Sequence, residues 1–232
     1  MNKNNRLQII GEIPARYGSQ RVKNKNLKLL HGKPLIWYAI EAAKNAKKLT
    51  DIYVNSEHDE LGKIAVENGV KFYKRDPSLA SDSATSDQFN YDFIKGTGAD
   101  VLVMINPVAP LVEADDIDNI IDYFNTNDYD TVISVKEEYL QAFYNGKPVN
   151  FNLNAMLPRT QDLIPVQICA WAVCIWNAHM FVESYEQNGY AVFSGKIGLY
   201  PMNILKSVKI STEEDFKLAE ALLIYREKNK NK

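Results

Sequence analysis

Short apolar runs alternate with stretches of helical periodicity along most of the chain. The apolar runs that predict strands cover residues 7–13, 51–55, 70–74, 100–106 and 130–136. Apolar residues recur at helical spacing over residues 34–48, 59–69, 85–96 and 115–125. This alternation predicts an α/β fold built on a doubly wound, mostly parallel sheet.

Local signals sharpen several of these predictions. The run at 100–106 is almost wholly apolar, as expected of a central strand that is buried on both faces. Thr85 and Gln88 are spaced as a capping box and predict a helix start. Ser211 and Glu214 have the same spacing, which predicts that Ser211 caps a last helix over residues 211–228.

The alternation of strands and helices stops after Lys136. Residues 137–166 contain turn signals but no clean helical period, and an apolar run at 167–176 predicts a return to the sheet. We therefore expect a single domain over residues 1–232, with 137–166 as a protruding arm that serves as a small dimerisation excursion.

Composition and charge narrow the function classes. The chain is 46% apolar and carries a net charge of −2, which argues against nucleic-acid binding. No stretch reaches the roughly 18 apolar residues that a membrane span needs. Cys169 and Cys174 lie in an apolar run and are expected to be free thiols. Few cysteines and a short, polar N-terminus predict a cytoplasmic protein without membrane contact.

A basic loop follows the first predicted strand. It holds Arg16, Arg21, Lys23 and Lys25, and no acid occurs between Glu12 and Glu41. In doubly wound sheets, ligands bind beyond the carboxyl ends of the strands, and Arg and Lys suit phosphate oxygens. The loop is thus a candidate phosphate site, with a solvated basic loop as the alternative. It matches neither the phosphate-binding loop GxxxxGK[ST] nor the dinucleotide pattern GxGxxG.

Several stretches together resemble one family. The loop reads IPARYGSQRVKNKNLKLLHGKPLI (13–36), and RDPSLASDSATS (75–86), INPVAPL (105–111), PRTQDL (158–163) and KISTEEDFKLAEAL (209–222) follow in order. These segments resemble the acylneuraminate cytidylyltransferase family, which makes CMP-sialic, CMP-legionaminic and CMP-pseudaminic acids and is related to the CMP-KDO synthetases. The resemblance spans nearly the whole chain.

The resemblance implies a Rossmann-like nucleotidyltransferase fold and transfer of CMP from CTP to an acidic 2-keto sugar, with release of pyrophosphate. It also implies a homodimer and a Mg²⁺ cofactor. Positioning and charge neutralisation do most of the work in such a transfer. The residues that it places around the nucleotide are Ala15, Arg16, Ser19, Gln20, Arg21, Lys25, Asn26, Arg75, Asp82 and Ser86. Arg16, Lys25 and Lys209 are the candidate catalytic residues.

The sequence departs from the family pattern in the metal and acceptor regions. The two carboxylates of the family's D-x-D are here Lys209 and Ser211, so the metal ligands are undetermined. Glu213 or Asp162 could hold the metal instead, or Lys209 could supply a fixed positive charge, with a solvated lysine as the alternative. The candidate acceptor-binding residues are Asn106, Arg159, Gln161 and Trp171. A second hypothesis follows: a catalytically impaired nucleotide-binding homologue.

Overall fold

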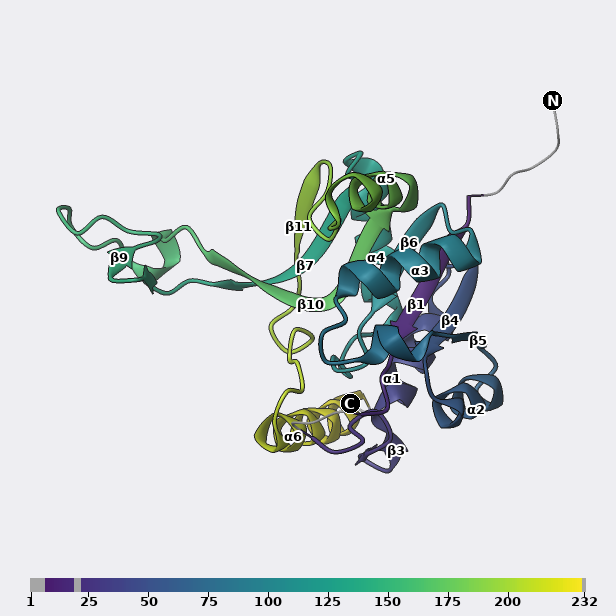
Figure 1. Ribbon diagram of the computed structural model, residues 1–232. Coiled ribbons are helices and arrows are strands. Elements are labelled where there is room, and N and C mark those ends of the chain that lie inside the picture. Colours follow the sequence, from purple (N-terminus) through teal and green to yellow (C-terminus); the bar gives the residue numbers. More distant parts are fainter. Residues whose placement is uncertain (1–6, 19–21, 231–232) are drawn as a thin grey trace.

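The computed structural model describes residues 7–18 and 22–230 and has a seven-stranded sheet at its centre (Figure 1). In chain order the strands are β1 (Ile9–Pro14), β4 (Asp51–Ser56), β5 (Lys71–Lys74), β6 (Val101–Ile105), β7 (Thr131–Glu138), β10 (Val166–Asn177) and β11 (Ile197–Pro201). In space they follow the order β11-β7-β10-β6-β1-β4-β5. Only β10 runs antiparallel to its neighbours, so the predicted mostly parallel sheet is confirmed.

Helices cover both faces of this sheet, and the last helix packs at its carboxyl edge. They are α1 (Leu35–Asn45), α2 (Asp59–Glu67), α3 (Ser86–Thr97), α4 (Ala114–Thr126), α5 (Ala178–Asn188) and α6 (Glu213–Lys230). The short elements are β2 (Leu29–Leu30), β3 (Lys33–Pro34), β8 (Phe143–Tyr144), β9 (Lys147–Pro148), and the 3₁₀ turns η1 (Pro77–Ala80) and η2 (Thr160–Asp162). Within the described residues, no helix has both the length and the apolar character that a membrane crossing requires.

Alternation of side chains along the strands creates one core on each face. Ile13 of β1 packs with the apolar sides of α1, α2 and α4, whereas Ile10 of the same strand packs with Phe93 of α3 and Phe181 of α5. A third apolar cluster joins α6 to the β2–β3 hairpin and the start of α1. This cluster brings the last part of the chain to the carboxyl edge of the sheet, next to the loop after β1.

The sequence did not predict one of the helices and one strand of the main sheet. The helix α5 buries only Ala178 and Phe181, so its apolar face is too narrow to give a clear helical period. The strand β11 forms an edge of the sheet, is largely accessible and ends in Pro201. Edge strands and weakly amphipathic helices carry the faintest sequence patterns, which accounts for both omissions.

The capping boxes have different outcomes. Thr85 and Gln88 form the predicted box at the start of α3. The predicted Ser211–Glu214 box is wrong, because the box forms one residue later, between Thr212 and Asp215. There the amide of Asp215 donates to Thr212 Oγ1 at 3.2 Å, and Asp215 Oδ2 accepts from the Thr212 amide at 2.8 Å. Ser211 therefore does not cap the last helix.

The chain between β7 and β10 projects from the body of the molecule and carries the β8–β9 hairpin (Figure 1). Asn150 braces its base, because its side-chain amide donates to the carbonyl oxygens of Leu140 and Ile164, both at 2.9 Å. We call residues 139–165 the arm. Large apolar side chains on it are exposed: Tyr139, Leu140, Phe143, Tyr144, Val149, Leu153, Met156, Leu157 and Ile164.

Candidate active site

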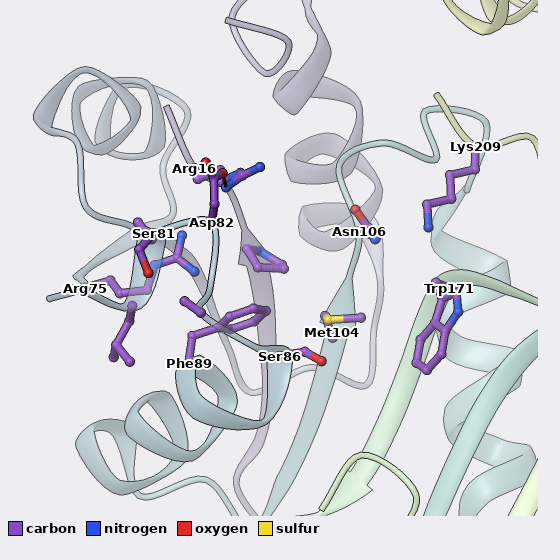
Figure 2. Close-up of a pocket in the computed structure, with 14 residues that line it drawn as sticks. Arg16, Arg75, Ser81, Asp82, Ser86, Phe89, Met104, Asn106, Trp171 and Lys209 are labelled. Atoms are coloured by element: carbon purple, nitrogen blue, oxygen red, sulfur yellow. Dashed lines mark hydrogen bonds and ion pairs between the residues drawn. The ribbon is translucent and has the colours of Figure 1, made fainter. Parts of the chain in front are cut away.

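A cleft opens at the carboxyl edge of the sheet, where β1, β5 and β6 end. It consists of two adjoining cavities of about 450 and 380 Å³. In Figure 2, Arg16 and Asp82 lie on one side of the larger cavity and Lys209 and Trp171 on the other, with Asn106 between them. The residues that line both cavities are Pro14, Arg16, Asp82, Asn106 and Lys209.

The loop after β1 is held against the end of β4. The Tyr17 amide donates to Glu57 Oε1 at 2.7 Å, and the Tyr17 ring stacks on His58 with 3.7 Å between ring centroids. Arg16 precedes this anchor and donates through Nη1 to Asp82 Oδ1 at 2.8 Å. Because both side chains of this ion pair are partly exposed in the cleft, an incoming anion can compete with Asp82 for Arg16.

Lys25 and Asn26 form the wall of the smaller cavity. Lys25 Nζ donates to the Ile210 carbonyl at 3.0 Å and so links this loop to the segment before α6. Asn26 is 5% exposed and donates to the Arg16 carbonyl at 3.0 Å. Its side-chain oxygen has no hydrogen-bond partner among the described residues. A buried, unpaired acceptor at a cavity wall favours a ligand that donates a hydrogen bond there.

Arg75 lies deep in the larger cavity, directly after β5. Its side chain is 3% exposed, and its guanidinium donates to the Ala15 carbonyl at 3.1 Å and approaches Glu57 Oε2 at 3.5 Å. The guanidinium carbon lies 5.0 Å from the centroid of the Phe89 ring. Burial lowers the pKa of Arg75, and the charges of Glu12 and Glu57 oppose this shift. The side chain is thus a fixed, positively charged part of the cavity wall.

A buried carboxyl group lies next to Arg75 within the fold. Glu12 of β1 is fully buried and accepts a hydrogen bond from Asn55 Nδ2 of β4 at 2.6 Å. Its second oxygen has no partner among the described residues. Burial raises the pKa of Glu12 to about 7, although the Asn55 hydrogen bond and the Arg75 charge act in the opposite direction. The charge of Glu12 therefore changes near neutral pH.

A bulge in β10 directs Trp171 into the cleft. The register of β10 against β7 shifts between Cys169 and Cys174, and Trp171 has a φ of 55°. Ser134 stabilises the bulge, since its buried hydroxyl accepts from the amides of Ala172 and Val173 at 3.0 and 3.1 Å. A left-handed tryptophan beside a cavity is a strained conformation of the kind found at binding sites.

The structure brings most of the predicted site residues together. The larger cavity is lined by Arg16, Arg75, Asp82, Ser86, Asn106, Trp171 and Lys209, and the smaller one adds Lys25 and Asn26. Ala15 is buried just below the cleft, where its carbonyl receives Arg75. Ser19, Gln20 and Arg21 lie outside the described residues.

Four predicted residues do not reach this cleft. Arg159 and Gln161 lie on the arm, where Arg159 binds Asp162 at 2.7 Å instead of lining the cavities. Glu213, the first residue of α6, forms an ion pair with Lys28 at 2.5 Å. Neither alternative metal ligand, Asp162 or Glu213, therefore lines the cavities of its own chain: Asp162 pairs with Arg159 three residues earlier, and Glu213 pairs with the distant Lys28.

Sequence reasoning missed several functional candidates. Phe89 and Met104 line the larger cavity, Ser134 holds the bulge that carries Trp171, and Glu12 is fully buried in β1. Phe89 comes three residues after Ser86 on α3, so helical spacing could have indicated it. Glu12 had a clear signal as well, because an acid in the middle of an apolar strand is unusual. Nothing in the sequence indicates the role of Ser134.

The donor set of the cleft fits a divalent cation poorly. Asp82 is the one acid among the described lining residues, and it is bonded to Arg16. Over the described part of the chain, no group of three or more His, Cys, Asp and Glu side chains is arranged to hold a metal ion. Magnesium at phosphates usually takes one or two carboxylates from the protein.

A doubly wound sheet with a cationic cleft at its carboxyl edge and a basic loop after its first strand defines a nucleotide-binding enzyme of the nucleotidyltransferase class. Comparison with known proteins identifies the family. The family model described as cytidylyltransferase matches residues 10–231. The chain belongs to the cytidylyltransferase family, which confirms the resemblance seen in its sequence.

The curated relatives cover this chain at low identity. Post-translational flagellin modification protein B of Campylobacter coli is 28% identical over 240 residues, which are 96% of this chain and 97% of that protein. N-acylneuraminate cytidylyltransferase A of Danio rerio is 28% identical over 219 residues. That match covers 90% of this chain but 49% of the fish protein, so the chain spans about half the length of that relative.

A solved structure confirms the fold. CMP:2-keto-3-deoxy-manno-octonic acid synthetase, complexed with CTP, superposes with a TM-score of 0.72. The superposition covers 94% of this chain and 98% of that one at 14% sequence identity. At this identity the likeness establishes the Rossmann-like nucleotidyltransferase fold alone.

Proposed function

We propose that the protein transfers CMP from CTP to an acidic 2-keto sugar and releases pyrophosphate. The observation that carries the proposal is the gathering of Arg16, Lys25, Arg75 and Lys209 in one cleft at the carboxyl edge of the sheet. Four cations and one acid make this cleft strongly attractive to a triphosphate. Membership of the cytidylyltransferase family supports CTP as the donor.

In the proposed reaction, the anomeric hydroxyl oxygen of the sugar bonds to the α-phosphorus of CTP. The bond from that phosphorus to the oxygen bridging to the β-phosphate breaks, pyrophosphate leaves with its electrons, and the hydroxyl proton passes to solvent. Arg16 and Lys25 would hold the phosphates in line and neutralise the charge that develops on the leaving group. Asn26 offers an unpaired acceptor to a donor such as the amino group of cytosine.

The proposal for the acceptor rests on the residues that line the larger cavity and on the name of a curated relative. The name of the fish relative contains N-acylneuraminate, which is an acidic sugar. In this chain Asn106 and Trp171 line the larger cavity beside Met104, which gives that side a polar amide next to apolar surface. We propose that the sugar lies against this wall, with Trp171 setting the bulk that it can carry.

Pyrophosphate release from CTP tests the function directly. The assay supplies CTP and Mg²⁺ with each of a panel of 2-keto acid sugars (N-acetylneuraminate, KDO, legionaminate and pseudaminate), while calorimetry measures CTP binding separately. We expect tight CTP binding and release with at least one acceptor. UTP serves as the control nucleotide, because it lacks the amino group offered to Asn26.

The same assay decides between the two candidate functions. CTP binding without release for any acceptor would favour the catalytically impaired homologue, a possibility raised by the single acid in the cleft. Absence of CTP binding would overturn both.

We also propose that the protein is a homodimer joined through the arm. The arm exposes many large apolar side chains, and Met156 is 94% exposed, which is unusual for a monomer. Such a dimer would allow Arg159 and Gln161 to serve the cleft of the partner. Light scattering should give a dimer mass for the wild type and a monomer mass for Met156→Asp/Leu157→Asp. Val66→Asp, at an exposed apolar position on α2, is the matched control and should remain dimeric.

A further inference from the structure

The cations of the cleft come from three well-separated parts of the chain. Arg16 and Lys25 lie in the loop after β1, Arg75 follows β5, and Lys209 precedes α6. The described lining offers one carboxylate, Asp82, which is bonded to Arg16. A site that holds a divalent cation with its own side chains would show the reverse balance, with acids in excess.

The main chain directly after Lys209 is firmly held. The Ile210 amide donates to the Val108 carbonyl at 2.8 Å, and the Ile210 carbonyl accepts from Lys25 Nζ at 3.0 Å. Ile210 itself is fully buried in the cluster that contains α6. These contacts fix the point from which the Lys209 side chain extends into the cleft.

The Lys209 ammonium is available to a ligand. It belongs to the lining of both cavities and lies across the larger one from Arg16 (Figure 2). Among the described residues, none forms an ion pair or hydrogen bond with it. A lysine at a firmly held position, without a partner and facing three other cations, suits an anion that fills the space between them.

We propose that Lys209 takes the place of a protein-held divalent cation and binds the phosphate groups of the nucleotide directly. The inference rests on the proposed function and deepens it, because it says how this cleft neutralises a triphosphate without protein carboxylates that hold a metal ion. An ammonium is a compact point charge with three donors and is well suited to phosphate oxygens. Nucleotide binding then depends on Lys209 and hardly on free Mg²⁺.

Calorimetric CTP binding with the full chain tests this inference. We expect the wild-type Kd to change by less than about threefold when Mg²⁺ is replaced by EDTA at equal ionic strength. Lys209→Met should raise the Kd roughly tenfold or more, as loss of a charge-assisted hydrogen bond predicts. Lys217→Met removes the same charge from an exposed position on α6 outside both cavities and should leave the Kd unchanged.

A gain-of-function variant gives a second measurement. Lys209→Asp/Ser211→Asp places two carboxylates on the wall that Lys209 and Ser211 now line. CTP binding by this variant should become strongly dependent on Mg²⁺, because phosphates and carboxylates then repel each other unless a cation lies between them.

Three results would overturn the inference: a wild-type Kd that rises tenfold or more in EDTA, an unchanged Kd for Lys209→Met, or a double variant that remains indifferent to Mg²⁺. Each of them leaves the proposed function standing, because CTP still binds. If CTP fails to bind the wild type under any condition, the proposed function fails and this inference fails with it.

Discussion

Replacing Glu12 by Gln should stabilise the protein at pH 8 by up to roughly 3 kcal/mol and leave its stability nearly unchanged at pH 4.5. The folded protein raises the pKa of this buried carboxyl from 4.5 to about 7. The free energy of unfolding of the wild type therefore falls as the pH rises from 4.5 to about 7, by about 1.4 kcal/mol per pH unit, because folding then requires Glu12 to stay protonated. Glutamine keeps the acceptor for Asn55 and carries no charge.

Urea unfolding of wild type and Glu12→Gln at pH 4.5, 6 and 8 measures this difference. Glu67→Gln changes an exposed glutamate at the end of α2 and is the matched control, with no stability change expected at any of these pH values. If Glu12→Gln is destabilising at pH 8, or if its effect is the same at all three pH values, Glu12 is charged in the folded protein throughout.

Replacing Arg16 by Ala should cause the largest loss of CTP affinity among single changes in the cleft, with the Kd raised by roughly 100-fold. Loss of charge-assisted hydrogen bonds to phosphate accounts for about 1.5–3 kcal/mol. A further loss arises because the Arg16 charge no longer offsets the Asp82 carboxylate 2.8 Å away, which then repels the triphosphate more strongly. Calorimetry with CTP gives the Kd directly.

A double-mutant cycle separates these two contributions. Arg16→Ala/Asp82→Asn removes both charges and should recover part of the affinity that Arg16→Ala loses, since the negative charge at position 82 is removed as well. Arg16→Lys keeps the charge but not the forked geometry and should fall between the wild type and Arg16→Ala. An Arg16→Ala Kd equal to that of the wild type would show that the loop after β1 does not bind the phosphates.

Much of the fold could be predicted because its strands and helices are strongly patterned. The run at 101–105 is buried throughout, and the box formed by Thr85 and Gln88 starts α3 as expected. The less patterned α5 and β11 were missed. The box at the last helix was placed one residue too early, because Ser211 and Thr212 both offer a suitable hydroxyl and local sequence does not distinguish them; in the fold Thr212 is the cap.

Local sequence likewise predicts one part of the candidate site, and the other part depends on contacts between distant segments. Arg16, Lys25 and Asn26 lie within a single loop, so local sequence was sufficient to group them. The burial of Arg75 against Phe89 depends on how α3 docks after β5. The left-handed conformation of Trp171 depends on a hydroxyl that a neighbouring strand supplies. Contacts between segments far apart in the chain leave no periodic trace in the sequence.

Local patterns in the sequence were enough to predict the alternation of strands and helices, the basic loop after the first strand and the family to which the chain belongs. How the predicted charges of the site are arranged in the cleft depends on tertiary structure. The tertiary structure brings Lys209 across from Arg16, pairs Glu213 with Lys28 away from the cavities, and buries Glu12 beside Arg75. Sequence spacing cannot set these distances, because the order of strands in the sheet and the docking of α6 arise only when the whole core packs.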